Sequence, residues 1–204
     1  MSFTQFKNIP QVQQKYAIKY IEQNFIQPLS FELSAYFLTE FEFNLANLDV
    51  FASEAARCEI IIFPVLREVY KYYAEQFALW VQKPISFDAQ LSGVPDYVIS
   101  KKSAFGKLYL EMPLVAVVEA KKNDFEQGWG QCLAELVAAQ KLNNNPSLSI
   151  YGIVTDGKTW EFGCLTNDLF IKNTKGYTLD NLAELLGSLN FIFQKIHAVL
   201  VSGT

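Results

Sequence analysis

The chain contains two apolar runs, Leu91-Ser-Gly-Val-Pro-Asp96-Tyr-Val-Ile-Ser100 and Pro113-Leu-Val-Ala-Val-Val118-Glu119-Ala-Lys121-Lys122, and these runs decide its fold. A polar turn separates them. The stretch from Leu114 to Val118 is apolar at every position and mostly β-branched, which is typical of a strand buried on both faces. We therefore expect this strand at the centre of a sheet.

Each run carries an acid on or beside its expected strand. Asp96 stands in the middle of the first run, and Glu119 and Lys121 lie at the end of the second. Because side chains alternate along a strand, Glu119 and Lys121 should point to the same side. Charged groups are rarely buried unless they are paired or hold a metal ion. The two residues are therefore either an ion pair at a strand end or part of a site.

Composition limits the classes of function. The chain has 204 residues, 50% of them hydrophobic and 15% aromatic, which is enough for one domain with a large core. The formal net charge of -4 argues against a polybasic, sequence-independent coat for nucleic acid. A local basic cleft stays open, and its candidate residues are Lys101, Lys102, Lys107, Lys121 and Lys122.

The cysteines and the histidine predict neither a zinc site nor a disulfide framework. Cys58, Cys132 and Cys164 are odd in number and widely spaced. His197 lies in an apolar carboxy-terminal stretch, so histidine-based catalysis is not expected. A basic-then-apolar signal segment is missing, and no apolar run is long enough to span a bilayer. We expect a cytoplasmic protein that does not bind membranes.

The amino-terminal half predicts mainly helices. Residues 1–9 look loose, and residues 10–25 fit an amphipathic helix. Residues 29–50 are rich in Phe, Leu and Glu, and the part from Phe31 to Leu38 fits either a helix or a strand. Ser53 is a good N-cap for a helix that Pro64 should kink or divide. Residues 80–91 should form an irregular link. We expect residues 1–50 to be an extension packed on a domain of residues 51–204.

The carboxy-terminal half predicts alternating strands and helices. A short strand is expected at residues 108–110. Asp124 and Gln127 have capping-box spacing for a helix that stops near Asn143. The Asp156-Gly157 turn should join strands at residues 150–155 and 159–165, and residues 181–201 should form a closing helix. This order predicts an α/β fold with a mixed β-sheet flanked by helices.

The charged residues of the two runs suit phosphodiester hydrolysis. That reaction needs a divalent cation at the phosphate and a water activated beside it. Mg²⁺ prefers a few carboxylates together with waters and substrate oxygens. Asp96 and Glu119, at neighbouring strand positions, could supply the carboxylates. Lys121 could orient the water and stabilise developing negative charge.

These motifs resemble those of a known family. Pro95-Asp96, followed by Glu119-Ala120-Lys121 at the end of an apolar strand, resembles the PD-(D/E)XK nuclease superfamily, which has the restriction-endonuclease-like fold. The pattern is most similar to the amino-terminal nuclease domain of type I restriction-enzyme motor subunits. In this comparison, Glu54 matches a helix glutamate in the site of that domain, and Gln131 matches the glutamine of its QxxxY-type signature. Glu135 stands where that signature has an aromatic residue, so the chain departs from it there. The resemblance covers roughly residues 53–165.

The resemblance implies a core in αβββαβ order and a Mg²⁺-dependent nuclease, with Mn²⁺ as a substitute. Asp96, Glu119 and the Ala120 carbonyl would bind the metal, and Glu54 would support a second metal or a water. Lys121 would position the attacking water. Gln131 would orient Lys121 or contact the substrate. The implied partner is nucleic acid, DNA in the first place, cut to leave a 5′ phosphate. A homodimer stays open.

Structural interpretations exist for each of these residues. Glu54 is favoured in a first helical turn by the helix dipole, and Pro95-Asp96 can be a strand entry. Glu135, like Glu126 and Glu161, has the pattern of a surface charge. Trp129 either packs the helix start or stacks on a base. Two further readings of the whole chain are a nuclease-fold binding or assembly module without turnover, and a purely structural domain.

Overall fold

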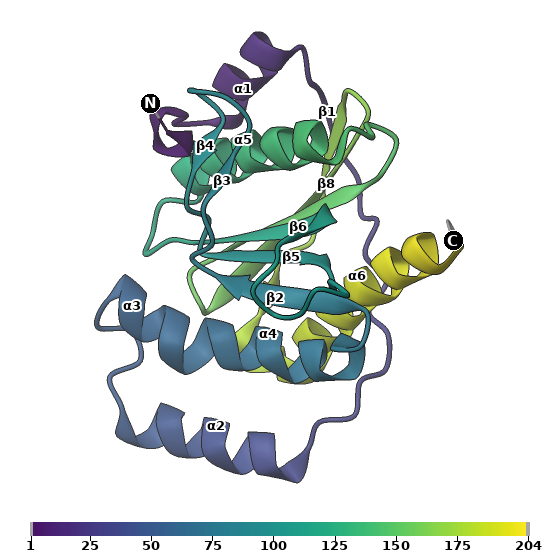
Figure 1. The fold of residues 1–204 in the computed structure, drawn as a ribbon. Helices are drawn as coiled ribbons and strands as arrows, with labels where there is room; N and C mark the ends of the chain where they lie inside the picture. Colours follow the sequence, from purple (N-terminus) through teal and green to yellow (C-terminus); the bar gives the residue numbers. More distant parts are fainter. Residues whose placement is uncertain (1, 203–204) are drawn as a thin grey trace.

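The computed structural model describes residues 2–202, and the side chains of residues 2–200. Its centre is a mixed sheet of eight strands in the order β1-β9-β8-β7-β6-β5-β2, with β10 paired to β8. Figure 1 shows helices on both faces of this sheet, α1 and α5 on one side and α2, α3, α4 and α6 on the other. The expected α/β fold with a mixed sheet flanked by helices is confirmed.

The central strands are those that the sequence predicts. β5 (Tyr97–Lys101) and β6 (Glu111–Ala120) pair antiparallel, and β6 pairs parallel with β7 (Ile150–Thr155). Residues 114–118 of β6 have no exposed surface, as expected for a strand covered on both faces. β7 turns at Asp156-Gly157 into β8 (Thr159–Thr166), which confirms the expected hairpin.

Helix α5 (Phe125–Asn143) connects β6 to β7 across one face of the sheet. Its N-cap is Asp124, whose Oδ1 accepts a hydrogen bond of 2.9 Å from the Gln127 backbone N–H, as the capping-box spacing predicts. Residues 128–139 of this helix are all buried. They are enclosed because the amino-terminal segment covers the outer side of α5; a Cβ on Gly130 would meet the Asn8 backbone nitrogen at 2.4 Å.

The helix predicted after Ser53 forms in four consecutive parts. α3 (Glu54–Arg57) leads into a wide π-helical turn (Cys58–Ile62) and then into α4 (Phe63–Tyr70) and a 3-10 turn (Lys71–Tyr73). The Ser53 hydroxyl caps α3 by accepting from the Ala56 N–H at 3.0 Å. Pro64 lies in the first turn of α4, where its missing N–H is tolerated, and the wide turn precedes it. The expected division at Pro64 is confirmed.

The amino-terminal predictions are partly wrong. Residues 1–9 were expected to be loose, but Phe3–Gln5 form a 3-10 turn, and Phe3 and Phe6 are buried. The expected helix at 10–25 is only α1 (Ile9–Tyr16), because Ala17 adopts a left-handed conformation with φ of 55°. β1 (Lys19–Glu22) follows and pairs parallel with β9 (Leu169–Lys172). The segment at residues 29–50 contains α2 (Ala35–Asn47).

Two further predictions are corrected around β5. The expected irregular link, residues 80–91, contains the end of β2 (Phe77–Val81), which pairs with β5 at the sheet edge. It also contains β3 (Ile85–Ser86), which pairs with β4 (Ser92–Gly93) just beyond the link. No strand forms at residues 108–110, which are a turn and bend region instead. Leu108 is 84% exposed there, so no apolar neighbour supports a strand.

The carboxy-terminal part completes the second helix layer. After β10 (Tyr177–Thr178) and a 3-10 turn (Leu179–Asn181), α6 (Leu182–Ser202) packs beside α4, which confirms the expected closing helix. Residues before 50 contribute to the buried clusters on both faces of the sheet. The division at residue 50 stays a prediction. No helix in the described part of the chain is both long enough and apolar enough to cross a membrane.

Candidate functional site

Asp96 and Glu119 meet at the ends of two paired strands. Asp96 directly precedes β5, and Glu119 is the next-to-last residue of β6. Tyr97 is the antiparallel partner of Val118, so Asp96 and Glu119 are the next cross-strand neighbours. The Asp96 Oδ2 accepts a hydrogen bond of 2.7 Å from the Ala120 backbone N–H. This bond fixes the Asp96 carboxylate at the end of β6.

Glu119 and Lys121 form an ion pair on the side of the sheet that α5 covers. The Lys121 Nζ donates to the Glu119 Oε1 at 2.6 Å, and the two side chains are 17% and 2% exposed. The shared side confirms the expected alternation, since Val117 of the same strand face packs in the cluster with α5. Among the described residues, the Glu119 Oε2 has no hydrogen-bond donor.

The site concentrates negative charge around one ammonium group. Burial, and then the charge of Asp96, raise the pKa of Glu119 against the opposing effect of Lys121. Burial also raises the pKa of Asp96, although the Ala120 N–H and Lys121 oppose the shift, and Glu54 adds to it. Burial of Lys121 disfavours its charge, but Glu119, Glu54 and Asp96 outweigh this effect and raise its pKa. Lys121 is therefore held as a cation.

Glu54 approaches the same point from the opposite helix layer. It lies in the first turn of α3, and its charge acts on both Asp96 and Lys121. An open pocket of about 450 Å³ lies between α3 and the start of β5. The residues that line it are Glu54, Ala55, Cys58, Glu59, Phe63, Val81, Gln82, Asp96 and Tyr97. Two of the candidate acids, Glu54 and Asp96, therefore face one cavity.

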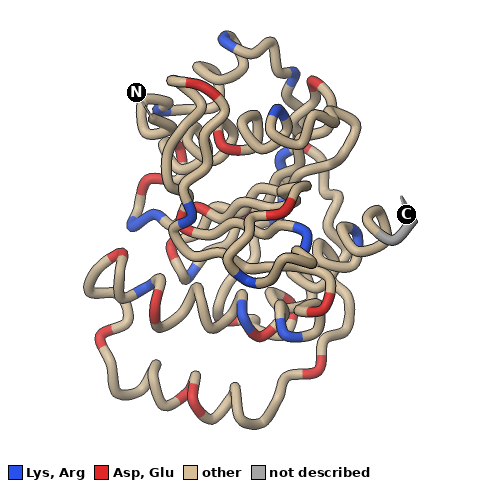
Figure 2. Tube along the Cα trace, in the orientation of Figure 1, with Lys and Arg blue, Asp and Glu red and all other residues tan. Residues whose placement is uncertain are grey.

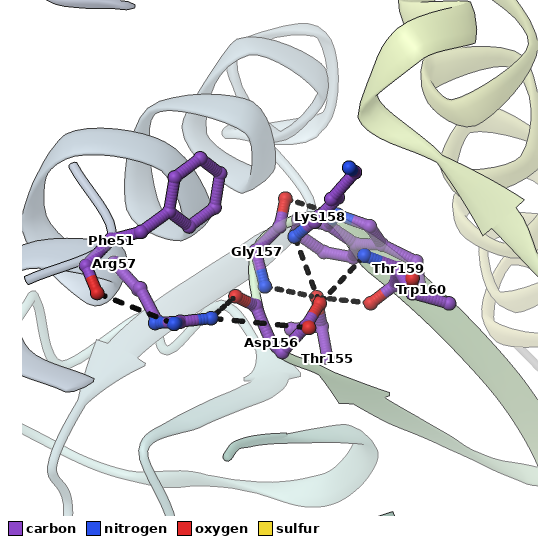
Figure 3. A network of polar contacts seen from close by, with 8 residues as sticks. All are labelled: Phe51, Arg57, Thr155, Asp156, Gly157, Lys158, Thr159 and Trp160. Atoms are coloured by element: carbon purple, nitrogen blue, oxygen red, sulfur yellow. Dashed lines mark hydrogen bonds and ion pairs between the residues drawn. The ribbon is translucent and has the colours of Figure 1, made fainter. Parts of the chain in front are cut away.

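Arg57 anchors α3 to the turn between β7 and β8, as Figure 3 shows. Its guanidinium donates to the Asp156 carbonyl at 2.8 Å and to the Phe51 carbonyl at 3.3 Å, and it lies over the Phe51 ring at 5.1 Å. Asp156 belongs to the β7–β8 turn, which Thr155 and Asp156 side chains hold by further bonds. Arg57 thus fixes the helix that carries Glu54 to a turn beside β6.

Gln131 and Glu135 lie on one face of α5, one turn apart. The Gln131 Nε2 donates to the Glu135 Oε1 at 3.3 Å, and no bond from Gln131 to Lys121 is present, contrary to one expected role. Glu135 is 0% exposed, so its interpretation as a surface charge is wrong. Burial, and then the charge of Glu119, raise the pKa of Glu135. Sequence reasoning missed Glu135 and Arg57 as neighbours of the site; the four-residue spacing from Gln131 is a signal for Glu135.

The side chains of the site could supply only some of the ligands of a divalent cation. Within residues 2–200, no group of three or more His, Cys, Asp or Glu side chains is placed to hold a metal ion. The two neighbouring carboxylates of Asp96 and Glu119 are a smaller set, of the kind that Mg²⁺ accepts with waters and substrate oxygens. The buried Glu119 Oε2, which has no donor, is a free acceptor for such an ion.

Other sequence candidates lie outside the site. Trp129 is buried and donates to the Glu161 Oε2 at 2.6 Å, so it packs α5 instead of facing solvent. The lysines of the expected basic cleft are divided, because Lys101 ends β5 while Asp96 precedes its start. Figure 2 shows acidic and basic residues interspersed over most of the fold, with acidic residues alone along α2.

The comparisons with known proteins identify no family. No family model matches the chain, and no curated protein matches it. Among solved structures, the chain is similar to a cryo-EM structure of a DrdV–DNA complex, with a TM-score of 0.44 and 12% sequence identity. That match covers 79% of this chain and 14% of the other chain, so this chain spans a small part of that protein's length.

Proposed function

We propose that the chain is a metal-dependent nuclease of the PD-(D/E)XK type. The observation that carries the proposal is the convergence of Asp96, Glu119 and Lys121 at the ends of β5 and β6, where the Asp96–Ala120 bond and the Lys121–Glu119 pair fix all three. Buried charged groups that are gathered at one point and have shifted pKa values are typical of functional sites.

The order of the elements supports the finer fold assignment, a restriction-endonuclease-like core. The helical segment α3 to α4 precedes β2, β5 and β6, then α5 and β7 follow. This succession is the αβββαβ order that the resemblance implies, with the β3–β4 hairpin as an insertion between β2 and β5.

In this proposal each residue has a defined role. Asp96 and Glu119, with the Ala120 carbonyl, would bind Mg²⁺ or Mn²⁺, which stabilises charge on the phosphate and makes a bound water more acidic. Glu54 would support a second ion or a water across the pocket. Lys121, kept cationic by the surrounding acids, orients the water and stabilises the negative charge that develops on phosphate oxygens. Gln131, whose Nε2 donates to Glu135, would act on the site from α5 without a direct bond to Lys121. The substrate would be DNA, cut to leave a 5′ phosphate.

The test compares wild type with Lys121→Ala on single- and double-stranded DNA and on RNA, with Mg²⁺ or Mn²⁺. We expect cleavage by wild type and a loss of roughly 10²–10³-fold in kcat for the variant, as for loss of one charge-stabilising group. Lys122→Ala, which changes the exposed neighbouring lysine, is the matched control and should cleave like wild type. Equal activity of wild type and Lys121→Ala on every substrate would contradict the proposal.

A second candidate function is a binding or assembly module that keeps this fold without turnover. The observation in its favour is that Lys121 already neutralises Glu119 at 2.6 Å in the described structure, so a metal ion would have to share that carboxylate. Calorimetric titration with Mn²⁺ separates the two candidates. Heat of binding that Asp96→Asn abolishes supports the nuclease, and no binding to wild type supports the module.

A further inference from the structure

Glu135 is an acidic residue at a fully buried position, where acidic residues are rare. It lies in the middle of α5, between the helix and the sheet, with no exposed surface. Among the described residues, its Oε2 has no hydrogen-bond donor, and the Glu119 Oε2 and the Gln131 Oε1 also have no partner. Buried polar atoms without partners cost stability, so such a cluster requires a reason beyond packing.

The buried polar cluster extends from α5 toward the start of β5 and the end of β6. Gln131 and Glu135 are one helical turn apart and share a face, and the Gln131 Nε2 donates to the Glu135 Oε1 at 3.3 Å. The Glu135 carboxyl group lies beside that of Glu119, since each acts on the pKa of the other. Lys121 holds one oxygen of Glu119, and Glu135 approaches the same carboxyl group from the helix.

We propose that Glu135 is a positioning residue of the candidate site, which bridges Gln131 to Glu119 and thereby sets where the Glu119 carboxylate lies. This inference rests on the proposed nuclease function. Glu135 acts through Glu119 and is not itself a ligand, because no three acidic side chains of the described chain are placed around one ion. Groups that orient a metal-binding carboxylate contribute to metal affinity although they never touch the metal.

Three substitutions separate this role from the alternatives. Glu135→Gln keeps the reach of the side chain, since its amide oxygen can accept from Gln131 and its NH₂ can donate to Glu119. Glu135→Asp keeps the carboxyl group and withdraws it by one methylene. Glu135→Leu keeps the approximate volume and removes both polar contacts. Glu126→Leu, at an exposed acid of the same helix, is the matched control.

The first readout is the Mn²⁺ dissociation constant, measured by calorimetry on folded protein without substrate. If Glu135 positions Glu119 through the length of its side chain, Glu135→Gln and Glu126→Leu should bind Mn²⁺ like wild type. Glu135→Asp and Glu135→Leu should bind about 10–100-fold more weakly. If Glu135→Leu binds like wild type, the inference is overturned. Weak binding by Glu135→Gln together with retained binding by Glu135→Asp would make Glu135 a charged ligand, which also overturns it.

The second readout does not depend on the metal and keeps the two proposals apart. Crystal structures of Glu135→Gln and Glu135→Asp should show Glu119 in its wild-type position in the first and displaced in the second; an unmoved Glu119 in both overturns the inference. If wild type binds no Mn²⁺, the proposed function fails and this readout alone decides the role of Glu135. If Asp96→Asn abolishes Mn²⁺ binding but the Glu135 variants have no effect, only the inference fails.

Discussion

At the scale of single residues, burial disfavours the ionised form of the acids in the site. Asp96, Glu119 and Glu135 all have raised pKa values, and burial is the largest cause for each. Lys121 is the cation that the structure pairs with this group. The free protein therefore carries an electrostatic cost at the site, which a divalent cation would offset.

This cost predicts how stability depends on pH in the absence of metal. Burial raises the pKa of Glu119 from 4.5 to about 8, so between these values the folded chain binds more protons than the unfolded chain. The free energy of unfolding should therefore fall as pH rises from about 4.5 to about 8. Glu119→Gln, which cannot ionise, should flatten that part of the profile. Urea denaturation with EDTA at several pH values measures both slopes, and identical slopes would contradict the prediction.

The residue pattern allowed part of the site to be predicted. Asp96, Glu119 and Lys121 could be grouped because strand alternation and the order of two neighbouring strands restrict where their side chains point. Glu135 could not be identified as buried from the sequence, because α5 lies between the sheet and the amino-terminal segment and both contacts are long-range. Arg57 was missed because its partner across the fold, Asp156, lies 99 residues further along the sequence.

At the scale of elements, α3 depends on Arg57 for its place against the sheet. The helix proper has only four residues, too few to be stable alone, and the guanidinium bonds supply contacts to two carbonyls across the layers. Glu54 lies three residues before Arg57 on this helix. The position of Glu54 over the pocket therefore follows from the Arg57 contacts.

Removing these contacts should destabilise the chain. Arg57→Met leaves the Asp156 and Phe51 carbonyls without the guanidinium donors, and we expect a loss of about 2–4 kcal/mol in the free energy of unfolding. Arg67→Met, at an exposed arginine of α4 that stacks over Phe63, is the control and should change stability by less than about 1 kcal/mol. Urea denaturation of both variants measures the difference. Equal losses would show that Arg57 has no special role.

The elements that could be predicted are those whose own sequence specifies them. β6, the β7–β8 hairpin and α5 have long apolar periodicity, a turn dipeptide or a capping box. The end of α1 at Ala17 and the strand β1 could not be predicted, because a left-handed alanine has no sequence signal and β1 gains its bonds from β9, far along the chain. β2 likewise depends on pairing with β5.

At the scale of the whole molecule, the amino-terminal segment is part of the fold. Phe3, Phe6 and Val12 pack into the same buried cluster as α5 and the α5 face of the sheet. Phe3 also contacts the β4 hairpin, since a Cβ on Gly93 would lie 2.6 Å from its ring. The helix that carries Gln131 and Glu135 is therefore enclosed by residues from the amino-terminal end of the described chain.

Truncating this packing should affect the stability of the whole chain. Phe3→Ala removes a ring that is 1% exposed, and we expect a loss of about 3–5 kcal/mol in the free energy of unfolding. Phe105→Ala, at a ring that is 80% exposed, is the matched control and should be close to neutral. Thermal denaturation followed by circular dichroism measures both. A Phe3→Ala variant as stable as the control would mean that the segment is not part of the core.

The site draws its residues from both helix layers and from the sheet between them. Glu54 comes from one layer, Gln131 and Glu135 from the other, and Asp96, Glu119 and Lys121 from the strand ends. The most direct test of the account is therefore a crystal structure of the protein soaked with Mn²⁺, with the metal located by anomalous scattering. We predict one ion bonded to carboxylate oxygens of both Asp96 and Glu119. A map without an ion at these residues, or with an ion bonded to neither of them, would contradict it.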